Sequence, residues 1–210
     1  MKNQIRYIIF CFFCCLFLVH GQHTLSISFG ESIHLKKIPQ NTLFTIHLGT
    51  KEILLNESTI NQYVFETPGK YTIDVTTPKQ DHLEACSGHK FPQKIFVTVY
   101  SVKCTFRSEE LVFSKPIKKG IELQGEILSI PIDVKTYRNQ EVSSDIGTVS
   151  TAGIGITIKA TPSENQKVFH TGTYTITYQL QGNAAQQGVI VFDFIDLNHK
   201  VQSIPIKIEN

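Results

Sequence analysis

The 210-residue sequence has no tryptophan, and its single methionine is the initiator. It also lacks an apolar run of the roughly 18–20 residues that a membrane-spanning helix needs. Charged residues make up only 18% of the chain against 41% hydrophobic residues, a balance that excludes extended disorder. An excess of one charge is missing too, because the formal net charge is +2. Without Lys2 and Arg6 the two signs balance at 18 each, which argues against a nucleic-acid-binding protein.

The sequence also lacks the motifs of common enzyme classes. It contains no Gly-x-Ser-x-Gly, His-Glu-x-x-His or Walker loop. The segment Ala152-Gly153-Ile154-Gly155 resembles half of a dinucleotide fingerprint, but the residues after it favour a strand rather than the required helix. Glu109 and Glu110 are adjacent, so in a strand they face opposite sides and form a poor acid/base pair. We therefore expect that this protein is not an enzyme.

The first 21 residues have the pattern of a secretory signal peptide. Lys2 and Arg6 supply a short cationic head, and Ile8–Val19 is an unbroken apolar stretch. Gly21 then offers a small residue before the polar Gln22, which suits a cleavage site. We expect a chain that is exported to a secreted, periplasmic or cell-surface location, with no transmembrane segment in the mature protein.

Most of the mature chain consists of short runs that alternate between apolar and polar residues, separated by turn residues. Tyr71, Ile73 and Val75 fall on one face of such a run, and Thr72 and Asp74 fall on the other. The expected strands are 24–29, 32–37, 43–48, 52–56, 63–65, 70–76, 95–102, 105–113, 121–123, 127–137, 155–160, 173–180, 189–195 and 201–208. No helical apolar stripe accompanies them, so the pattern predicts an all-β fold.

Two sets of about seven strands predict two consecutive antiparallel β-sandwiches, at residues 22–103 and 104–210, after a signal peptide at residues 1–21. A short internal repeat favours this division, because Gly-x-Tyr-Thr-Ile occurs at residues 69–73 and again at 172–176. The tyrosine just after a tight turn suits a hydroxyl that bonds back to nearby backbone, as in the tyrosine corner of immunoglobulin-like sandwiches.

The segment Pro68-Gly69-Lys70-Tyr71-Thr72-Ile73 resembles the penultimate strand of PKD and Ig-like domains in bacterial secreted and surface proteins. The Trp-Asp-Phe-Gly-Asp-Gly segment of true PKD modules is absent, since the chain has no tryptophan. The resemblance therefore implies architecture only, namely two Ig-like domains.

The segment Pro78–Gln93 is much longer than an ordinary hairpin loop, and it contains His82, Cys86 and His89. Thiolate and imidazole side chains at such spacing are ligands for zinc or copper. Cys86-Ser87-Gly88-His89 before a strand also resembles the ligand loop of cupredoxins. That resemblance implies Cys86 as the thiolate, His89 as one imidazole, and His34 or His47 as the other, although the axial methionine of the family is missing.

Cys86 has two alternatives to metal binding. Cys86 and Cys104 are the only cysteines that remain after removal of the leader, and an exported chain meets an oxidising compartment. A Cys86–Cys104 disulfide is one alternative, and unpaired structural cysteines are the other.

These patterns predict a non-catalytic binding, adhesion or assembly module of the cell envelope. We expect a protein or glycan partner and no nucleic acid, with 78–93 as the best candidate recognition loop. The alternative function is cupredoxin-like binding of copper or zinc, or electron transfer, at the Cys86/His89 loop. Only this alternative implies a cofactor, which would be copper or zinc.

Overall fold

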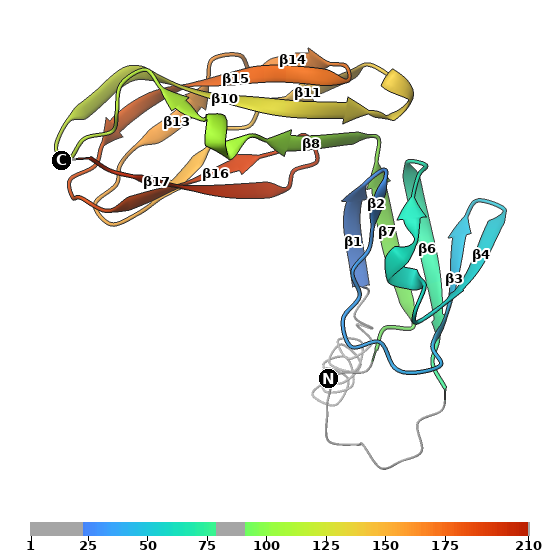
Figure 1. Cartoon of the computed structure of the whole chain (residues 1–210). Coiled ribbons are helices and arrows are strands. Elements are labelled where there is room, and N and C mark those ends of the chain that lie inside the picture. Colours follow the sequence, from blue (N-terminus) through green and yellow to red (C-terminus); the bar gives the residue numbers. More distant parts are fainter. Residues whose placement is uncertain (1–22, 79–90, 210) are drawn as a thin grey trace, which may run out of the picture. The chain divides into compact units, whose positions relative to one another are not determined.

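The computed structural model describes residues 23–78 and 91–209, and nearly all of their regular structure is β-strand (Figure 1). Helical structure in these ranges is limited to the 3₁₀ segments Ile60–Gln62, Ser108–Glu110 and Tyr137–Asn139. None of the described helical segments has the length and apolar character needed to cross a bilayer. The predicted all-β fold class is confirmed, whereas the expected signal peptide at residues 1–21 lies outside the described residues.

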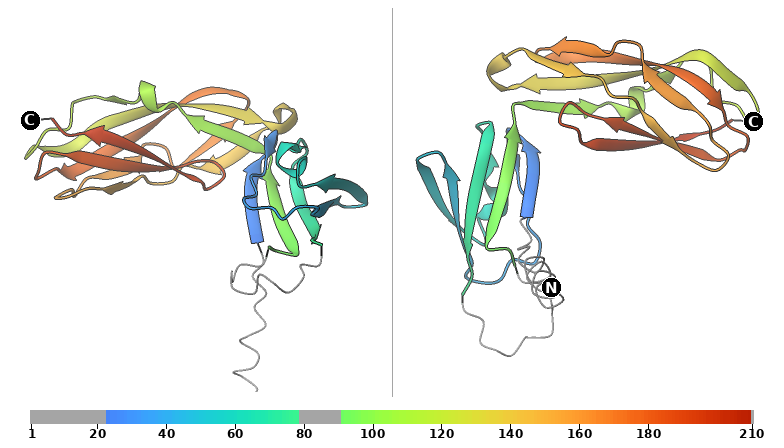
Figure 2. Two further views of the ribbon diagram at one scale, coloured as in Figure 1. Left: turned by 60° about the horizontal axis from the view of Figure 1, so that its bottom comes forward. Right: turned by 180° about the vertical axis from the view of Figure 1, so that it is seen from behind.

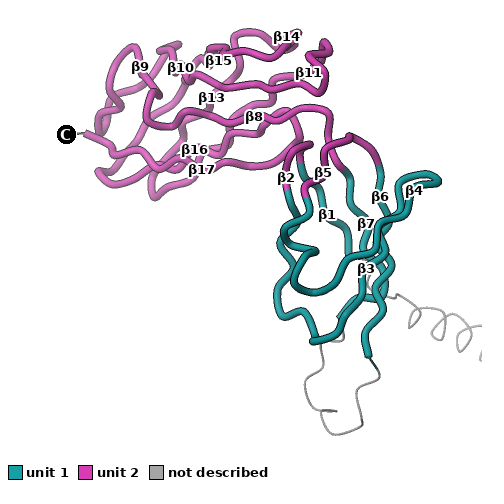
Figure 3. The backbone as a smooth tube through the Cα atoms, turned by 45° about the vertical axis from the view of Figure 1, so that its right-hand side comes forward, with its two compact units in different colours: residues 1–27, 32–63, 70–98 teal, residues 28–31, 64–69, 99–210 magenta. Residues whose placement is uncertain are grey.

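The described residues form two compact units (Figure 3). Unit 1 contains 32–63 and the described parts of 1–27 and 70–98, and unit 2 contains 28–31, 64–69 and 99–209. The short segments 28–31 and 64–69 thus belong to unit 2, although their neighbours along the chain belong to unit 1.

The main sheet of the first half of the chain has five strands in the order β1-β7-β6-β3-β4. Their bounds are His23–Ser28, Lys94–Tyr100, Gly69–Thr76, Leu43–Leu48 and Lys51–Asn56. A separate pair joins β2 (Glu31–Ser32) to β5 (Val64–Phe65). The order β7-β6-β3 matches the G-F-C order of an immunoglobulin sandwich, and the β2–β5 pair matches its B and E strands.

Alternation of side chains positions the core of unit 1. On β6, Tyr71, Ile73 and Val75 are buried, whereas Thr72 and Asp74 remain partly exposed, as the sequence pattern predicts. Burial of an aliphatic or aromatic side chain is worth roughly 1.5–3 kcal/mol, so this row of residues stabilises the sheet considerably. The buried apolar residues of unit 1 are Ile33, Leu35, Phe44, Ile46, Ile60, Tyr71, Ile73, Val75, Ile95 and Val97.

Unit 2 contains a sheet in the order β13-β15-β10-β8 and a three-stranded sheet in the order β12-β16-β17 (Figure 2). In the first sheet the bounds are Lys159–Pro162, Gly172–Asn183, Glu122–Thr136 and Val102–Phe106, and β9 (Val112–Phe113) also pairs with β10. In the second they are Ser150–Ala152, Val189–Ile195 and Val201–Lys207. The small β11 (Val142–Asp145) and β14 (Gln166–Phe169) pair separately. These orders match the A-B-E-D and C-F-G sheets of an immunoglobulin domain.

The core of unit 2 is rich in aromatic rings. Phe194 on β16 lies 5.3 Å from Phe106 and 5.7 Å from Tyr178, measured between ring centroids. These distances fall within the range at which aromatic pairs add stability beyond their buried area. The cluster continues through the buried β10 residues Leu128 and Ile130. Side chains from both sheets of unit 2 therefore share one interior.

One predicted strand boundary is wrong because a bulge was taken for a break. The expected strands 121–123 and 127–137 form the single strand β10. The pairing register with β15 shifts between Gln124 and Glu126, and Gly125 has a φ of 111°. A glycine in this conformation makes room for a bulge while the strand continues. Pro131 is tolerated in β10 because it lies between the residues that pair with β8 and those that pair with β9.

The predicted strand 32–37 is also wrong, since only Glu31–Ser32 is a strand. The physical reason is that the Asn61 side chain, and not a neighbouring strand, binds the backbone of this segment at Leu35. Asn61 Oδ1 accepts the N–H of Leu35 at 2.8 Å, and Asn61 Nδ2 donates to the Leu35 carbonyl at 3.0 Å. The backbone of Leu35 is thus satisfied without a strand partner.

The two Gly-x-Tyr segments do not occupy equivalent positions. Tyr71 lies on β6, between β7 and β3, whereas Tyr174 lies on β15, between β10 and β13. The expected bond from hydroxyl to backbone is confirmed at Tyr174, whose hydroxyl accepts the His170 N–H at 2.8 Å and donates to the His170 carbonyl at 3.3 Å. The repeat therefore reflects a shared way of starting a strand and not a duplicated position in the fold.

Candidate functional site

Of the four predicted metal ligands His82, Cys86, His89 and His47, only His47 lies in the described residues. It lies on β3 between carboxylates of the two adjacent strands, with Nδ1 3.3 Å from Glu52 Oε1 and Nε2 3.0 Å from Asp74 Oδ2. The Nε2 atom is buried, and its approach to Asp74 has an ion-pair distance without hydrogen-bond alignment. Lys94 Nζ lies 3.2 Å from the other Asp74 oxygen. His47 is therefore part of a row of polar side chains, Glu52, His47, Asp74 and Lys94, across one sheet.

The remaining predicted ligands His82, Cys86 and His89 lie outside the described residues, and so does most of the candidate loop 78–93. His34, the other histidine considered, is exposed. Within residues 23–78 and 91–209 no group of three or more His, Cys, Asp or Glu side chains is arranged to hold a metal ion. The copper or zinc site stays a prediction.

Cys104 is a half-buried residue of β8 and has no disulfide partner within residues 23–78 and 91–209. Burial raises the pKa of this thiol to about 12, and the negative charges of Asp196 and Asp133 add to the shift, whereas a backbone hydrogen bond at Leu197 opposes it. A thiol with so high a pKa is a poor nucleophile and a poor metal ligand at neutral pH, because the reactive form is the thiolate. Cys86 lies outside the described residues, so the Cys86–Cys104 disulfide also stays a prediction.

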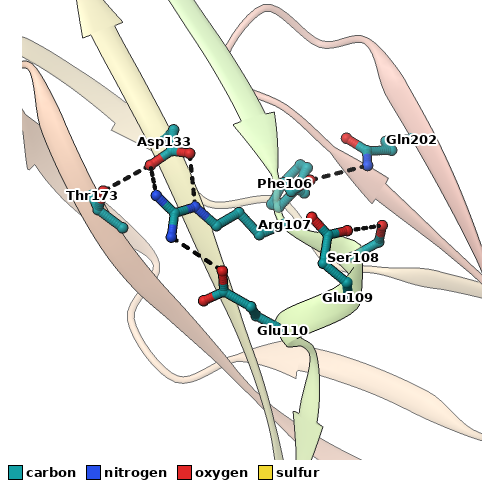
Figure 4. Close-up of polar contacts among 8 residues, drawn as sticks. All are labelled: Phe106, Arg107, Ser108, Glu109, Glu110, Asp133, Thr173 and Gln202. Carbon is teal, nitrogen blue, oxygen red and sulfur yellow. Dashed lines mark hydrogen bonds and ion pairs between the residues drawn. The ribbon is translucent and has the colours of Figure 1, made fainter.

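An ion-pair cluster centred on Arg107 joins the outer side of β8 to β10 and β15 (Figure 4). The Arg107 guanidinium donates to both oxygens of Asp133 at 2.8 Å, and Thr173 Oγ1 donates to Asp133 Oδ1 at 2.7 Å. Arg107 also binds Glu110 at 3.1 Å. Glu110 lies in the 3₁₀ segment Ser108–Glu110, so the expected continuous strand 105–113 is wrong at this point. Hydrogen bonds from Arg107 and Thr173 lower the pKa of Asp133, which keeps this carboxylate ionised and occupied.

A second polar cluster in unit 2 is centred on Glu31 and Asn198, and sequence reasoning did not identify it. Glu31 lies 3.2 Å from Lys103 and 3.6 Å from Lys200, and its carboxylate accepts the Ser28 N–H at 2.9 Å. Burial by itself would raise the pKa of Glu31, but the Ser28 N–H and the two lysines outweigh it and lower the pKa.

Asn198 is only 4% exposed. Its Nδ2 donates to the Val102 carbonyl at 2.8 Å and to Ser28 Oγ at 3.0 Å, across 96 and 170 positions of sequence. Asn198 lies in a turn, in which Asp196 Oδ1 accepts the Asn198 and Lys200 N–H groups at 2.8 Å. Nothing local in the sequence reveals partners so distant.

The outer surface of the β12-β16-β17 sheet carries mostly apolar side chains, which we call the β16–β17 face. Val189, Ile195 and Val201 are 55%, 39% and 61% exposed. The register places Val189 beside Lys207 and Ile195 beside Val201. The members of the face are Ser150, Ala152, Val189, Val191, Asp193, Ile195, Val201, Ser203, Pro205 and Lys207.

The comparisons with known proteins add little beyond the fold. No protein-family model and no curated protein matches the chain. Among solved structures it is similar to domains 4 and 5 of the S-layer protein SbsC, with 15% identity, a TM-score of 0.27, and coverage of 81% of this chain and 77% of that one. It is also similar to a glycosyl hydrolase family 2 member from Bacteroides cellulosilyticus, with 11% identity, a TM-score of 0.28, and coverage of 86% of this chain and 24% of that one. At these scores neither similarity supports an argument about function.

Proposed function

We propose that the mature chain is an exported, non-catalytic binding module of the cell envelope whose β16–β17 face docks a protein partner. The observation that supports this proposal most directly is the exposure of Val189, Ile195 and Val201 on one side of one sheet. Valine and isoleucine side chains on a sheet face are not stabilised by contact with water. Contiguous exposed apolar surface is typical of interaction sites.

The composition of the β16–β17 face favours a protein over a glycan. Its central polar pair, Asp193 and Ser203, bond to each other and so offer few free groups to sugar hydroxyls. Its only lysine, Lys207, lies at one end beside Val189. Asp193 and Lys207 are the only charged residues of the face, and a low content of charged residues is typical of the buried core of a protein–protein interface.

The polar clusters described above support a role without catalysis. His47 is flanked by two carboxylates, and the Asp133 carboxylate is occupied by Arg107 and Thr173. General acid or base catalysis needs a titratable group that is free to exchange a proton with a bound substrate. These groups instead bind one another across strands, so their geometry suits a stabilising role.

The proposal is tested by cross-linking in the organism of origin, with an affinity tag on the chain. The double variant Val189→Lys with Val201→Lys should lose the partner that the wild-type chain captures, because it adds charge to an apolar interface. Val112→Lys is the matched control, since Val112 and Val201 are both 61% exposed and Val112 lies on β9. Equal capture by wild type and the double variant would refute the assignment of the face, and specific binding to a glycan array would replace the protein partner.

Export and the metal alternative are tested on the same protein. We expect N-terminal sequencing of the exported chain to begin at Gln22, and a cytoplasmic chain that retains residues 1–21 would contradict the proposal. Copper is then added to the purified mature chain and a visible spectrum recorded. Strong thiolate-to-copper absorption that disappears with Cys86→Ser would replace the binding module by the electron-transfer alternative.

A further inference from the structure

The open edge of β4 is a second surface with unsatisfied binding groups, distinct from the β16–β17 face. In the described residues β4 pairs with β3 alone, and it ends the sheet order β1-β7-β6-β3-β4. Two of the other edge strands carry proline, at Pro162 in β13 and Pro205 in β17, whereas the edge strands β1, β8 and β12 do not. Proline, bulges and charged side chains are the usual means by which proteins prevent a strand from pairing with another chain. β4 has no proline, and its charged residues Lys51 and Glu52 occupy only its first two positions, so the edge from Ile53 onward lacks both devices.

The hairpin geometry identifies which backbone groups face the open edge. Gly49, with a φ of 59°, starts the two-residue turn between β3 and β4, and Leu48 pairs with Lys51 next to it. In a two-residue hairpin this closing pair exchanges hydrogen bonds, and the pairs then alternate along the strand. Glu52 and Leu54 therefore point their N–H and C=O groups away from β3.

Asn56, the next residue of this outward series, agrees with this alternation. Its N–H donates to Thr59 Oγ1 at 3.1 Å, and its carbonyl accepts the Thr59 N–H at 3.2 Å, both outside the ladder with β3. The local turn thus satisfies Asn56. The two N–H and two C=O groups of Glu52 and Leu54 are left at the edge.

We propose that β4 pairs antiparallel with β4 of a second copy of this chain, about a two-fold axis at Ile53. In this register Glu52 of each copy lies opposite Leu54 of the other, so all four outward groups of each strand gain a partner. The two Ile53 residues then face each other directly, at the close spacing of a non-hydrogen-bonded pair. No other antiparallel register of two β4 strands uses Glu52 and Leu54 on both copies without involving Asn56.

Charge and exposure favour a second copy over an unrelated strand. Lys51 begins β4 and Glu57 follows its last residue, so an antiparallel copy brings each lysine near the glutamate of its partner. A parallel arrangement would place like charges together. Leu54 is 67% exposed, and the two Leu54 side chains become diagonal neighbours on the outer side of the joined sheet. This inference does not depend on the proposed partner of the β16–β17 face.

The test begins with sedimentation velocity of the mature full-length chain over a range of concentrations. We expect a concentration-dependent dimer. Lys51→Glu and Glu57→Lys should each weaken it by about three- to tenfold, because each places like charges at both ends of the pairing. The double reversal should restore the wild-type dissociation constant to within about twofold, as expected for a pair that contributes through its charges. Leu54→Lys should give monomers while circular dichroism and the melting temperature remain those of the wild type.

Cysteine cross-linking tests the register itself, in a Cys86→Ser background. Ile53→Cys should form a disulfide-linked dimer under mild oxidation, because its two copies face each other across the axis. Leu55→Cys is the matched control and should not cross-link, since its two copies lie well apart along the strands.

Three results would overturn the proposal. One is a chain that remains monomeric at every concentration, and another is a dimer that neither Leu54→Lys nor the charge reversals affect. The third is a monomeric chain whose binding to a different protein is abolished by Leu54→Lys, which would assign the edge to an unrelated strand.

Discussion

Substitution of Asn198 by alanine should destabilise unit 2 more than any other single change to a polar side chain in the hairpin between β16 and β17. The Asn198 amide is 4% exposed and donates to the Val102 carbonyl and to Ser28 Oγ. Its own Oδ1 is buried with no partner among the described residues. Removal of the amide leaves two buried acceptors without a donor and also removes one buried acceptor that was already unsatisfied.

The magnitude follows from these three changes. A buried polar group that loses its partner costs about 1–3 kcal/mol, and Val102 O and Ser28 Oγ both lose one. The substitution also removes Asn198 Oδ1, a buried acceptor without a partner among the described residues, and this removal offsets about 1 kcal/mol of the cost. Because a hydroxyl rotates to find a new partner more easily than a carbonyl does, most of the cost belongs to Val102. We expect a loss of about 2 kcal/mol in the free energy of unfolding.

Urea unfolding of the full mature chain, followed by far-ultraviolet circular dichroism, measures this loss, and hydrogen exchange of peptides from unit 2 assigns it. Ser28→Ala should cost less, and the double variant should cost less than the sum, because the two side chains share one hydrogen bond. Asn198→Asp is a further comparison, since a buried carboxylate cannot donate to the Val102 carbonyl and should be worse than alanine at neutral pH. A change below about 0.5 kcal/mol for Asn198→Ala, the range of ordinary surface substitutions, would refute the reasoning.

Three other predictions concern unit 2. Arg107→Met should raise the pKa of Asp133 toward its ordinary value in a carboxyl titration followed by NMR; in the wild type the lowered pKa stabilises the fold above about pH 4, and this contribution is lost as the pH falls further. Gly182→Ala should cost roughly 2 kcal/mol or more in thermal unfolding, because Gly182 has a φ of 109° and an added Cβ would lie 2.5 Å from a backbone oxygen. The raised pKa of Cys104 stabilises the fold fully below about pH 8.5, so between about pH 8.5 and about pH 10 wild-type stability should fall by at most about 1.4 kcal/mol per pH unit, a contribution that Cys104→Val lacks; above about pH 10 the buried Tyr178, whose pKa is also raised, adds a loss in both proteins. If thiol counting of unreduced exported protein under denaturing conditions finds two free thiols, the disulfide with Cys86 is excluded.

The strands that the sequence predicts well are those whose alternation is supported by strong side-chain contrast. The expected range 189–195 agrees with β16, and 43–48 agrees with β3, since each has buried aromatic or branched residues at every second position. The strands that pattern reasoning missed are β11, β12 and β14, which are three or four residues long and mostly polar. Their sequences differ little from those of turns, and their pairing with distant strands decides their structure.

The polar clusters were hidden from the sequence for a different reason. Asp133 and Thr173 lie 40 positions apart, and the register between β10 and β15 pairs them directly. A one-residue slip in that register would put them on opposite faces, so their contact follows from the pairing and not from either segment alone. The same holds for His47 with Asp74, where the adjacent strands β3 and β6 bring the imidazole and the carboxylate together.

The outward-facing residues of the three larger sheets differ in a way that composition does not explain. His47 lies between two carboxylates on the β3-β6 face, and Arg107 binds Asp133 on the β8-β10 face, whereas the β16–β17 face is mostly apolar. Substitution of Val201 by threonine would keep its strand propensity and cost no core packing, because its side chain is 61% exposed. We therefore expect Val201→Thr to change the free energy of unfolding by less than about 0.5 kcal/mol. An exposed apolar side chain that contributes little to the stability of the fold is expected on a docking surface. A large loss of stability in Val201→Thr would instead show that the β16–β17 face stabilises the fold and would contradict its assignment as a docking surface.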